Sequence, residues 1–409
     1  MVLRPIALNG GTQDEIHLQE VTTKQLRSIV ADFKNLFLCI CDQTLKSHPV
    51  CQGGLDSSAI VGSVSALHEL PLRTFTAVSE NVVLDERRFA EAVNDFAGTS
   101  GRYILPTSEK LEADLDRIIW HQDEPFGSTS IFAQWCVFEA IRGEGIKVAL
   151  DGQGADEQLG GYNSFIVTKI LEDFQRRRYR TAFKSARSFM MNQRISVRDL
   201  GYAAGYRYLP EGVKSRLGQI AGIASQNAEL WIKKDFVNLT KYCDPFNASD
   251  SESRTVRQLS WDMVDRINLP LLLRFEDRNS MAFGVEARVP FVDHELMEFA
   301  LTLPEDFLIR GELTKSILRD AANSRLPEAV KNRRDKIGFQ TNEWQWLRQH
   351  RSEIGQLIRR DMEVARDIFS DDIQQLVDRQ LCNTSRQSSV PWRVVSFLRW
   401  MRVFDVSSS

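Results

Sequence analysis

The sequence lacks the patterns that mark secreted, zinc-finger and membrane proteins. Its six cysteines are scattered, with no Cys-x-x-Cys pair and no partner histidine spacing, which argues against a disulfide framework or a zinc site. No apolar run is long enough to cross a bilayer, and the first residues show no basic-then-apolar signal pattern. A formal net charge of −3 gives no electrostatic case for binding nucleic acid or membranes. We therefore expect a cytoplasmic protein with reduced thiols, and no nucleic-acid or membrane partner.

What is present is an ordinary globular composition, with 43% hydrophobic and 26% charged residues in 409. Residues 1–22 are polar and glycine-rich, and we read them as a lead-in segment. Strand-like and helix-like patterns then alternate over 23–162, which predicts an α/β lobe with a parallel, doubly wound sheet. Long amphipathic patterns follow over 163–409, which predicts a mainly helical lobe. In such sheets ligands bind beyond the carboxyl ends of the strands.

The most distinctive stretch is residues 50–58, Val-Cys-Gln-Gly-Gly-Leu-Asp-Ser-Ser, which precede apolar residues at helical spacing. Adjacent glycines let a backbone approach a ligand closely, and a helix N-terminus with two serines offers donors to an anion, most naturally phosphate. Asp56 fits an anion site only if it holds a cation, and Mg²⁺ that bridges phosphates is the usual reason. An ordinary strand-to-helix turn is the alternative that Gly-Gly alone would favour.

A second cluster, residues 150–162, carries four glycines and three carboxylates after an apolar strand. Glycines cost backbone entropy and clustered carboxylates repel one another, so stability alone does not explain them. Asp56 and Asp156 would lie at the same edge of the sheet, where they can share Mg²⁺ ions with a triphosphate. A glycine-rich helix cap is the less favoured alternative.

Residues 175–180, Gln-Arg-Arg-Arg-Tyr-Arg, form a basic run. Such a run can be a nucleic-acid patch, but at this net charge a solvated helix face is the better interpretation.

At the two loops the chain resembles the asparagine synthetase family, in its ATP-using synthetase domain. The family's pyrophosphate loop, Ser-Gly-Gly-Leu-Asp-Ser-Ser, corresponds to residues 52–58 here. Its second loop, Gly-x-Gly-x-Asp-Glu followed by Gly-Gly-Tyr, is matched at 152–157 and 160–162. Further matches lie, in the family's order, at 123–126, 272–282, 285–293, 315–319 and 333–339. The resemblance runs from about residue 23 to residue 347.

This resemblance implies an AMP-forming ligase that uses ATP and Mg²⁺, with the metal on Asp56 and Asp156. A small-molecule or peptide carboxylate would attack the α-phosphate of ATP, and ammonia or an amine would then displace AMP. The catalytic candidates are Lys336, which would neutralise charge at phosphorus, Gln153, and Glu276, which would orient the substrate. Arg278, Glu286 and Arg288 could equally form a structural ion-pair cluster. The residues expected to bind ATP and pyrophosphate are Gln52, Gly53, Gly54, Leu55, Asp56, Ser57, Ser58, Val78 and Gly152.

Three departures from the family bear on the reaction. Val2 stands where glutamine-using members open their glutaminase domain on a cysteine, so we expect no glutaminase activity from this chain. Ammonia, a substrate amine or a separate glutaminase subunit would supply the nitrogen. Gln52 replaces the loop's usual serine. Gln153 replaces a glutamate or, in β-lactam-forming relatives, a tyrosine, and a glutamine cannot act as a base.

Three alternatives to ammonia-dependent asparagine synthesis stay open. The first is an amide or macrolactam synthetase for a specialised metabolite or peptide. The second is another ligase of the pyrophosphatase-loop group. The third is a degenerate, non-catalytic relative that acts through a partner. The sequence indicates no oligomeric state.

Overall fold

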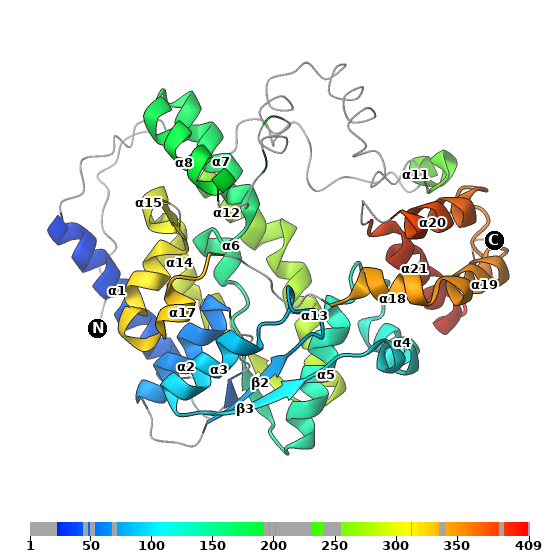
Figure 1. Ribbon diagram of the computed structural model, residues 1–409, viewed down its shortest axis with the longest axis horizontal. Helices are drawn as coiled ribbons and strands as arrows, with labels where there is room; N and C mark the ends of the chain where they lie inside the picture. Colours follow the sequence, from blue (N-terminus) through cyan, green and yellow to red (C-terminus); the bar gives the residue numbers. More distant parts are fainter. Residues whose placement is uncertain are drawn as a thin grey trace.

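The computed structural model describes residues 23–43, 48–49, 54–67, 72–191, 196, 201, 231–239, 255–311, 313–334, 341–383 and 388–407. The described chain is mixed α/β and mostly helical, with small parallel sheets (Figure 1). Gln52, Gly53 and Lys336, three of the predicted site residues, lie outside these ranges.

Two small parallel sheets stand where we expected one doubly wound sheet. In the first, β4 (Val148–Leu150) lies between β1 (His48–Pro49) and β5 (Glu286–Arg288). In the second, β2 (Arg73–Ala77) pairs with β3 (Ser100–Ile104). Parallel pairing was predicted correctly, but the single continuous sheet is not seen among the described residues, because β1, which lies beside β2, has only two residues in its ladder.

Helices pack on both sides of these strands, as expected for apolar segments that alternate with strands. In Figure 1, α2 (Leu55–Leu67) and α3 (Arg87–Ala97) lie to one side of β2 and β3, and α5 (Ser130–Gly143) lies to the other. Nine residues in the first ten of α2 are buried, because this helix is apolar on most of its surface. The helix therefore starts at the sheet edge and runs into the core, which fixes its N-terminus in place.

Helices dominate the rest of the described chain, as predicted. The strands β6 (Ile309–Arg310) and β7 (Leu313–Thr314) form a short antiparallel hairpin among them. The helices are α1 (Thr23–Gln43), α4 (Ser108–Gln122), α6 (Ala155–Leu159), α7 (Asn163–Gln175), α8 (Tyr179–Met191), α11 (Lys234–Leu239), α12 (Val256–Asp262), η4 (Met263–Ile267), α13 (Leu269–Ala282), η5 (Pro290–Val292), α14 (His294–Thr302), α15 (Glu305–Leu308), α16 (Ser316–Ala321), η6 (Asn323–Arg325), α17 (Glu328–Lys331), α18 (Glu343–Gln349), α19 (Arg351–Asp361), α20 (Ile373–Cys382) and α21 (Val390–Val403).

The hydrophobic cores join segments that are far apart in sequence. One core unites α1 and α2 with α14 and α16, and another unites α4 with α19, α20 and α21. Both cores draw on residues on either side of residue 162, where the sequence analysis placed a lobe boundary. The sheets and the helical half are thus held together by shared apolar packing.

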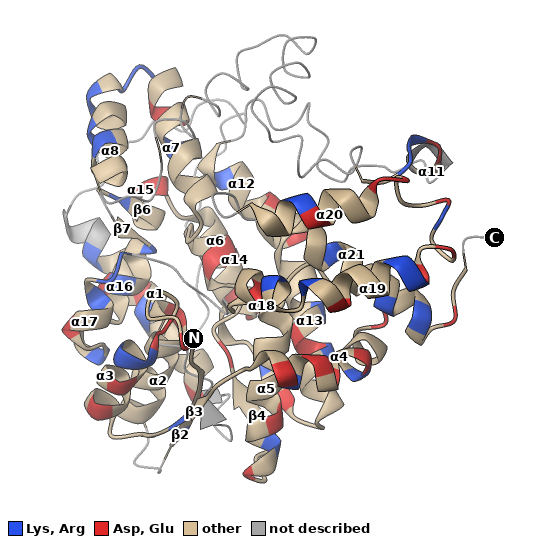
Figure 2. Ribbon diagram, turned by 45° about the vertical axis from the view of Figure 1, so that its right-hand side comes forward, with Lys and Arg blue, Asp and Glu red and all other residues tan. Residues whose placement is uncertain are grey.

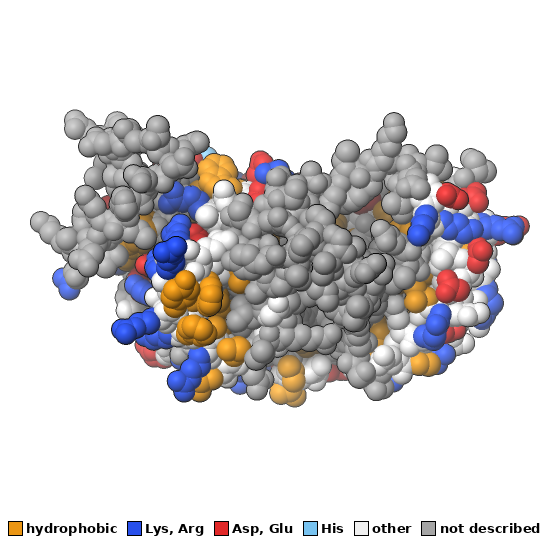
Figure 3. Space-filling view, turned by 90° about the horizontal axis from the view of Figure 1, so that it is seen from above, with side chains coloured by type: hydrophobic (Ala, Val, Ile, Leu, Met, Phe, Trp, Pro, Cys, Tyr) orange, Lys and Arg blue, Asp and Glu red, His pale blue; other side chains and the backbone are white. Residues whose placement is uncertain are grey.

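The basic run lies at the junction of α7 and α8, where Arg176, Arg177 and Arg178 form the turn and Arg180 lies in the first turn of α8 (Figure 2). Arg176 pairs with Glu172 at 2.6 Å, and Arg178 pairs with Asp173 at 2.8 Å. Two of its arginines thus make ion pairs within the protein. Seen from above, hydrophobic side chains lie beside Lys and Arg side chains over the pair of helices α7 and α8 (Figure 3).

Two further sequence predictions can be compared with the structure. Cys136, which is buried, and Cys382, which is exposed, are free thiols. None of the helices in the described part of the chain has the length and apolar character needed to span a membrane.

Candidate functional site

The first loop ends in the N-terminus of α2, where donors gather. The Ser58 amide N–H donates to the Gly54 carbonyl oxygen at 3.1 Å, which closes the first helical turn. Ser57 and Ser58 are buried, and the Ser58 hydroxyl has no hydrogen-bond partner in the described structure. A buried hydroxyl without a partner costs free energy, so its presence at a helix N-terminus favours a ligand with acceptor oxygens.

The second loop follows β4 and touches the first through Gly152. A Cβ atom at Gly152 would lie 2.9 Å from the Ser57 amide nitrogen and 3.0 Å from the Asp56 Cβ. Only a residue without a side chain allows two loops to approach this closely. The predicted meeting of the two motifs at one sheet edge is therefore present in the structure.

Lys315 lies between the two predicted metal ligands. Its Nζ atom is 2.5 Å from Asp56 Oδ2 and 2.6 Å from Asp156 Oδ1. Burial alone would lower the pKa of Lys315, but the Asp156 and Asp56 carboxylates outweigh burial and raise that pKa above its usual value. Lys315 opens the family match at 315–319, but we assigned it no role from the sequence.

The geometry fits a divalent cation shared with a nucleotide. Asp56 and Asp156 reach one common point, because both contact the same lysine nitrogen. Within the described ranges no group of three or more His, Cys, Asp or Glu side chains could hold a metal alone. Mg²⁺ is commonly held by one or two carboxylates with phosphate oxygens and water in its other positions, which is the arrangement that two aspartates can support.

A second carboxyl pair lies on the other side of Gly152. Asp151 and Glu276 are 4% and 2% exposed. No described hydrogen-bond donor reaches Asp151 Oδ2 or either Glu276 oxygen. Burial and a neighbouring like charge both disfavour ionisation, so the environment favours the neutral form of one of the two carboxyl groups. Burial raises the pKa of Asp151 to about 6, and burial and the Asp151 charge raise the pKa of Glu276 well above its usual value.

Glu157, next to Asp156, points away from the loops. It accepts a hydrogen bond from Asn268 Nδ2 at 2.7 Å and another from the Tyr162 hydroxyl. Burial raises the pKa of Tyr162, so the phenol remains a donor at neutral pH. The neighbouring carboxylates thus differ, since Asp156 faces the site and Glu157 holds α6 against the start of α13. Gln153, half-buried, lies in the turn before α6.

The arginines that we left open do not form one cluster. Arg288 pairs with Glu286 at 2.7 Å on β5. Arg278 lies 3.6 Å from Asp123 and donates to the His121 carbonyl oxygen at 3.2 Å. These contacts give both arginines partners within the protein.

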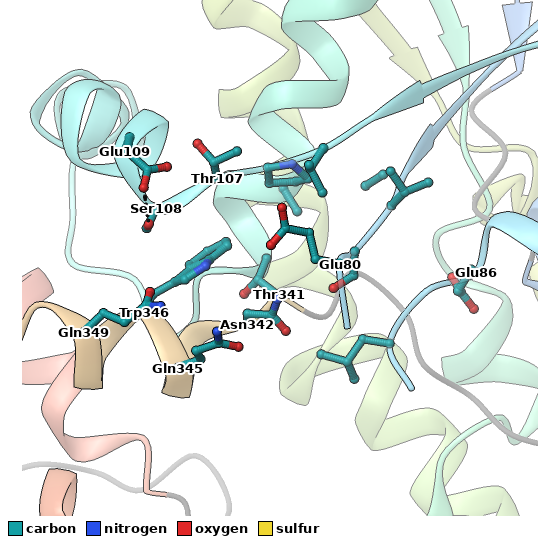
Figure 4. A pocket seen from close by; sticks show the side chains of 17 residues that line it. Glu80, Glu86, Thr107, Ser108, Glu109, Thr341, Asn342, Gln345, Trp346 and Gln349 are labelled. Atoms are coloured by element: carbon teal, nitrogen blue, oxygen red, sulfur yellow. Dashed lines mark hydrogen bonds between the residues drawn. The ribbon is translucent and has the colours of Figure 1, made fainter. Parts of the chain in front are cut away.

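Val78 lines a cavity of about 180 Å³ beyond the carboxyl ends of β2 and β3. Figure 4 shows Glu80 and Thr107 on the strand side and Trp346 and Asn342, from α18 and the residues before it, on the other. The Val78 N–H donates to the Ile104 carbonyl oxygen at 2.8 Å, so a ligand could meet only the Val78 carbonyl group. The cavity lies where the sheet rule places a ligand.

Arg319 connects the Lys315 turn to a later segment of the chain. Its guanidinium donates to the carbonyl oxygens of Thr314 at 2.9 Å, Lys331 at 2.6 Å and Arg333 at 2.9 Å. Arg333 in turn forms a buried ion pair with Glu86 at 2.6 Å. These bonds tie the end of α17 to the Lys315 turn and to the residues before α3. The family match at 333–339 therefore begins on a fixed residue.

Comparisons with known proteins show which family and which relatives the chain is similar to. The asparagine synthase family model matches residues 52–402. The glutamine-hydrolyzing asparagine synthetase 1 of Bacillus subtilis is 27% identical over 359 residues, which are 85% of this chain and 54% of the relative. A putative glutamine-hydrolyzing asparagine synthetase of Mycobacterium bovis is 25% identical, over 86% of this chain and 54% of the relative. Amidase chry2 of Gibberella zeae is 24% identical, with 68% of this chain and 47% of the relative covered. The chain spans about half the length of these relatives.

Proposed function

The chain belongs to the asparagine synthase family, and from this premise we propose that it is an ATP-dependent ligase that forms amide bonds. It activates a carboxylate as the acyl-adenylate, releases pyrophosphate, and transfers the acyl group to ammonia or an amine with release of AMP. The observation that carries the proposal is the convergence of Asp56, Asp156 and Lys315 beside the N-terminus of α2. Such a junction of paired carboxylates, a cation and helix donors suits a metal-bound polyphosphate.

The chain's own residues divide the work. Ser57, Ser58 and the first amides of α2 hold the departing pyrophosphate. Mg²⁺ on Asp56 and Asp156 would offset the negative charge of the phosphate oxygens. The cavity beside Val78 takes the adenine, and Lys336 neutralises charge at the α-phosphorus, as the family match suggests.

The nitrogen nucleophile loses a proton as its bond to the acyl carbon forms. Gln153 cannot accept this proton. The buried Asp151–Glu276 pair, next to Gly152, has raised pKa values and can take up a proton. We assign the acceptor role to this pair, in which Glu276 was predicted from the sequence to orient the substrate.

The finer architecture follows the same proposal. The two parallel sheets are parts of one doubly wound sheet in the order β3-β2-β1-β4-β5, which the position of β2 beside β1 supports. The enzyme is cytoplasmic. Free ammonia, an amine, or a separate glutaminase subunit supplies its nitrogen.

The proposal is tested by pyrophosphate exchange into ATP with a panel of aspartate, small acids and peptides, followed by product analysis with ammonia present. We expect at least one acid to yield AMP and pyrophosphate, and its amide. Release of ADP with every acid that binds would contradict the proposal. Asp56→Asn serves as the matched inactive variant, because it changes one carboxylate to a neutral isostere.

A second candidate, amide formation on a specialised metabolite, is favoured by the similarity to Amidase chry2. The same panel separates the two, because an asparagine-forming enzyme uses aspartate, whereas this candidate uses another acid of the panel and leaves aspartate unchanged.

A further inference from the structure

Lys315 occupies the point that a metal would take between Asp56 and Asp156. Its side chain is 6% exposed, and each aspartate side chain is 15% exposed. We propose that Lys315 is the resident counter-ion of these carboxylates in the nucleotide-free protein. It thereby excludes free divalent cations, so that the metal enters only together with the nucleotide. This inference rests on the proposed function only in naming the ligand as a metal–nucleotide complex.

The distances show why the lysine and a metal compete. Mg²⁺ binds carboxylate oxygens at about 2.0–2.1 Å, and the lysine nitrogen already lies 2.5 Å and 2.6 Å from one oxygen of each aspartate. A metal that bridged the same two oxygens would stand close to the ammonium group. Two cations at such a separation repel strongly in a buried site. One must leave before the other binds.

The surroundings are built to hold the lysine there. Lys315 has a φ of 55°, a left-handed conformation that lysine rarely adopts. Arg319 braces this turn from the Thr314 carbonyl oxygen. A Cβ atom at Gly161 would lie 2.5 Å from Lys315 Cε and 1.7 Å from Asp156 Oδ1, so the glycine makes room for the ion pair. Three separate features thus favour one position of the ammonium group.

A metal–nucleotide complex can displace the lysine where a free ion cannot. A free divalent ion must push a buried ammonium group away from two carboxylates and leave it without an acceptor. The complex brings anionic oxygens of its own, which can accept the displaced ammonium. The exchange therefore conserves paired charges only when metal and nucleotide arrive together. This coupling gives the site an order of binding and keeps it from loading metal without substrate.

The test is a titration of the full chain with Mn²⁺ in the absence of nucleotide. The electron paramagnetic resonance signal of the free ion measures the affinity. We expect weak binding by the unaltered protein and binding at least about tenfold tighter by Lys315→Met, because the metal then meets the two carboxylates without the ammonium group between them. Lys315→Arg keeps the cation and should keep the exclusion. The double variant Lys315→Met with Asp56→Asn should lose the gain.

Lys169→Met is the matched control. Lys169 is equally buried, with a side chain 6% exposed, and pairs with Asp173 and Asp306 on the α7–α15 side of the molecule. Its removal should lower stability without creating an Asp56-dependent Mn²⁺ site. If Lys315→Met does not fold, Lys315→Gln replaces it in the same titration.

The inference is overturned if folded Lys315→Met or Lys315→Gln binds Mn²⁺ alone no more tightly than the unaltered protein does. Failure of the proposed function would look different, since it would show as absent AMP and pyrophosphate formation whatever the Mn²⁺ affinity. The Mn²⁺ titration uses no nucleotide and no acid, so the two failures are separable.

Discussion

Two carboxyl pairs flank Gly152, and they solve the same electrostatic problem in opposite ways. Asp56 and Asp156 are held together by the Lys315 ammonium group. Asp151 and Glu276 have no cation beside them among the described residues, and burial raises the pKa of both. The first pair is an anionic site with a built-in counter-ion, whereas the second favours a neutral carboxyl group.

The difference between the two pairs shows that residue type alone does not decide whether a buried carboxyl group is charged or neutral. All four groups are buried or nearly so, and each carboxyl group would repel its neighbour if both were ionised. A lysine from a distant turn keeps one pair charged, and its absence keeps the other partly neutral. Altering each pair in turn therefore tests whether the lysine accounts for the difference.

The largest effect is expected where the charged pair is broken. Asp156→Asn should lower the affinity for Mg²⁺–ATP by at least about tenfold and the rate of pyrophosphate exchange by about 100-fold or more, because one metal ligand becomes neutral. Calorimetric titration and the exchange assay measure the two quantities.

Glu157→Gln is the control for this variant, since its carboxylate accepts hydrogen bonds from Asn268 and Tyr162 instead of facing the site. We expect a loss of stability of about 1–2 kcal/mol with nucleotide affinity retained. Equal losses of affinity in Asp156→Asn and Glu157→Gln would show that the two adjacent carboxylates are not divided in this way.

An intermediate effect is expected where the protonated pair is broken. Burial raises the folded-state pKa of Asp151 to about 6 from an ordinary value of 3.8. The folded protein thus binds more protons than the unfolded chain between these values, and the free energy of unfolding falls as pH rises from about 4 through 6. The shift corresponds to on the order of 3 kcal/mol above pH 7.

Glu276→Gln should flatten that dependence, because it removes a second buried carboxyl group whose folded-state pKa is raised. Urea unfolding at pH 4 to 8 measures the slope in both proteins. Glu172, whose pKa burial raises to about 7, titrates in both and cancels in the difference. An exposed control, Glu295→Gln, should leave the slope as it is in the unaltered protein. An unaltered slope in Glu276→Gln would mean that folding does not raise the pKa of Glu276.

The smallest effect is expected at the neutral donor beside the charged pair. Ser58→Ala removes a buried hydroxyl that has no hydrogen-bond partner among the described residues, so stability should hold while ATP affinity falls by about fivefold to tenfold, as for one lost hydrogen bond to phosphate. Ser63→Ala, a buried serine of the same helix, should leave ATP affinity unchanged. Thermal unfolding and calorimetric titration compare the two; equal losses of affinity would rule out a phosphate role for Ser58.

Helices and strands followed closely from local pattern. The alternating patterns over 23–162 predicted strands and helices, and the structure has β1 to β4 and α1 to α6 in that range. Local pattern was less informative at residues 175–180, where a charge run suggested a helix face but Arg176, Arg177 and Arg178 form a turn between two helices. Charge says little about conformation, whereas apolar periodicity reports which side of an element meets the core.

What the sequence by itself determined is the family, the two loops and the residue types that phosphate and metal chemistry require. The adjacent glycines, Asp56 and Asp156 are readable because each loop is a short local motif. Only the tertiary structure decided how the carboxylates are paired. Lys315 contacts Asp56, which lies 259 residues earlier in the chain. Glu276, the neighbour of Asp151, lies on α13, a helix far from Asp151 in sequence. A pKa depends on burial and on the nearest charge, and neither is visible before the chain is folded.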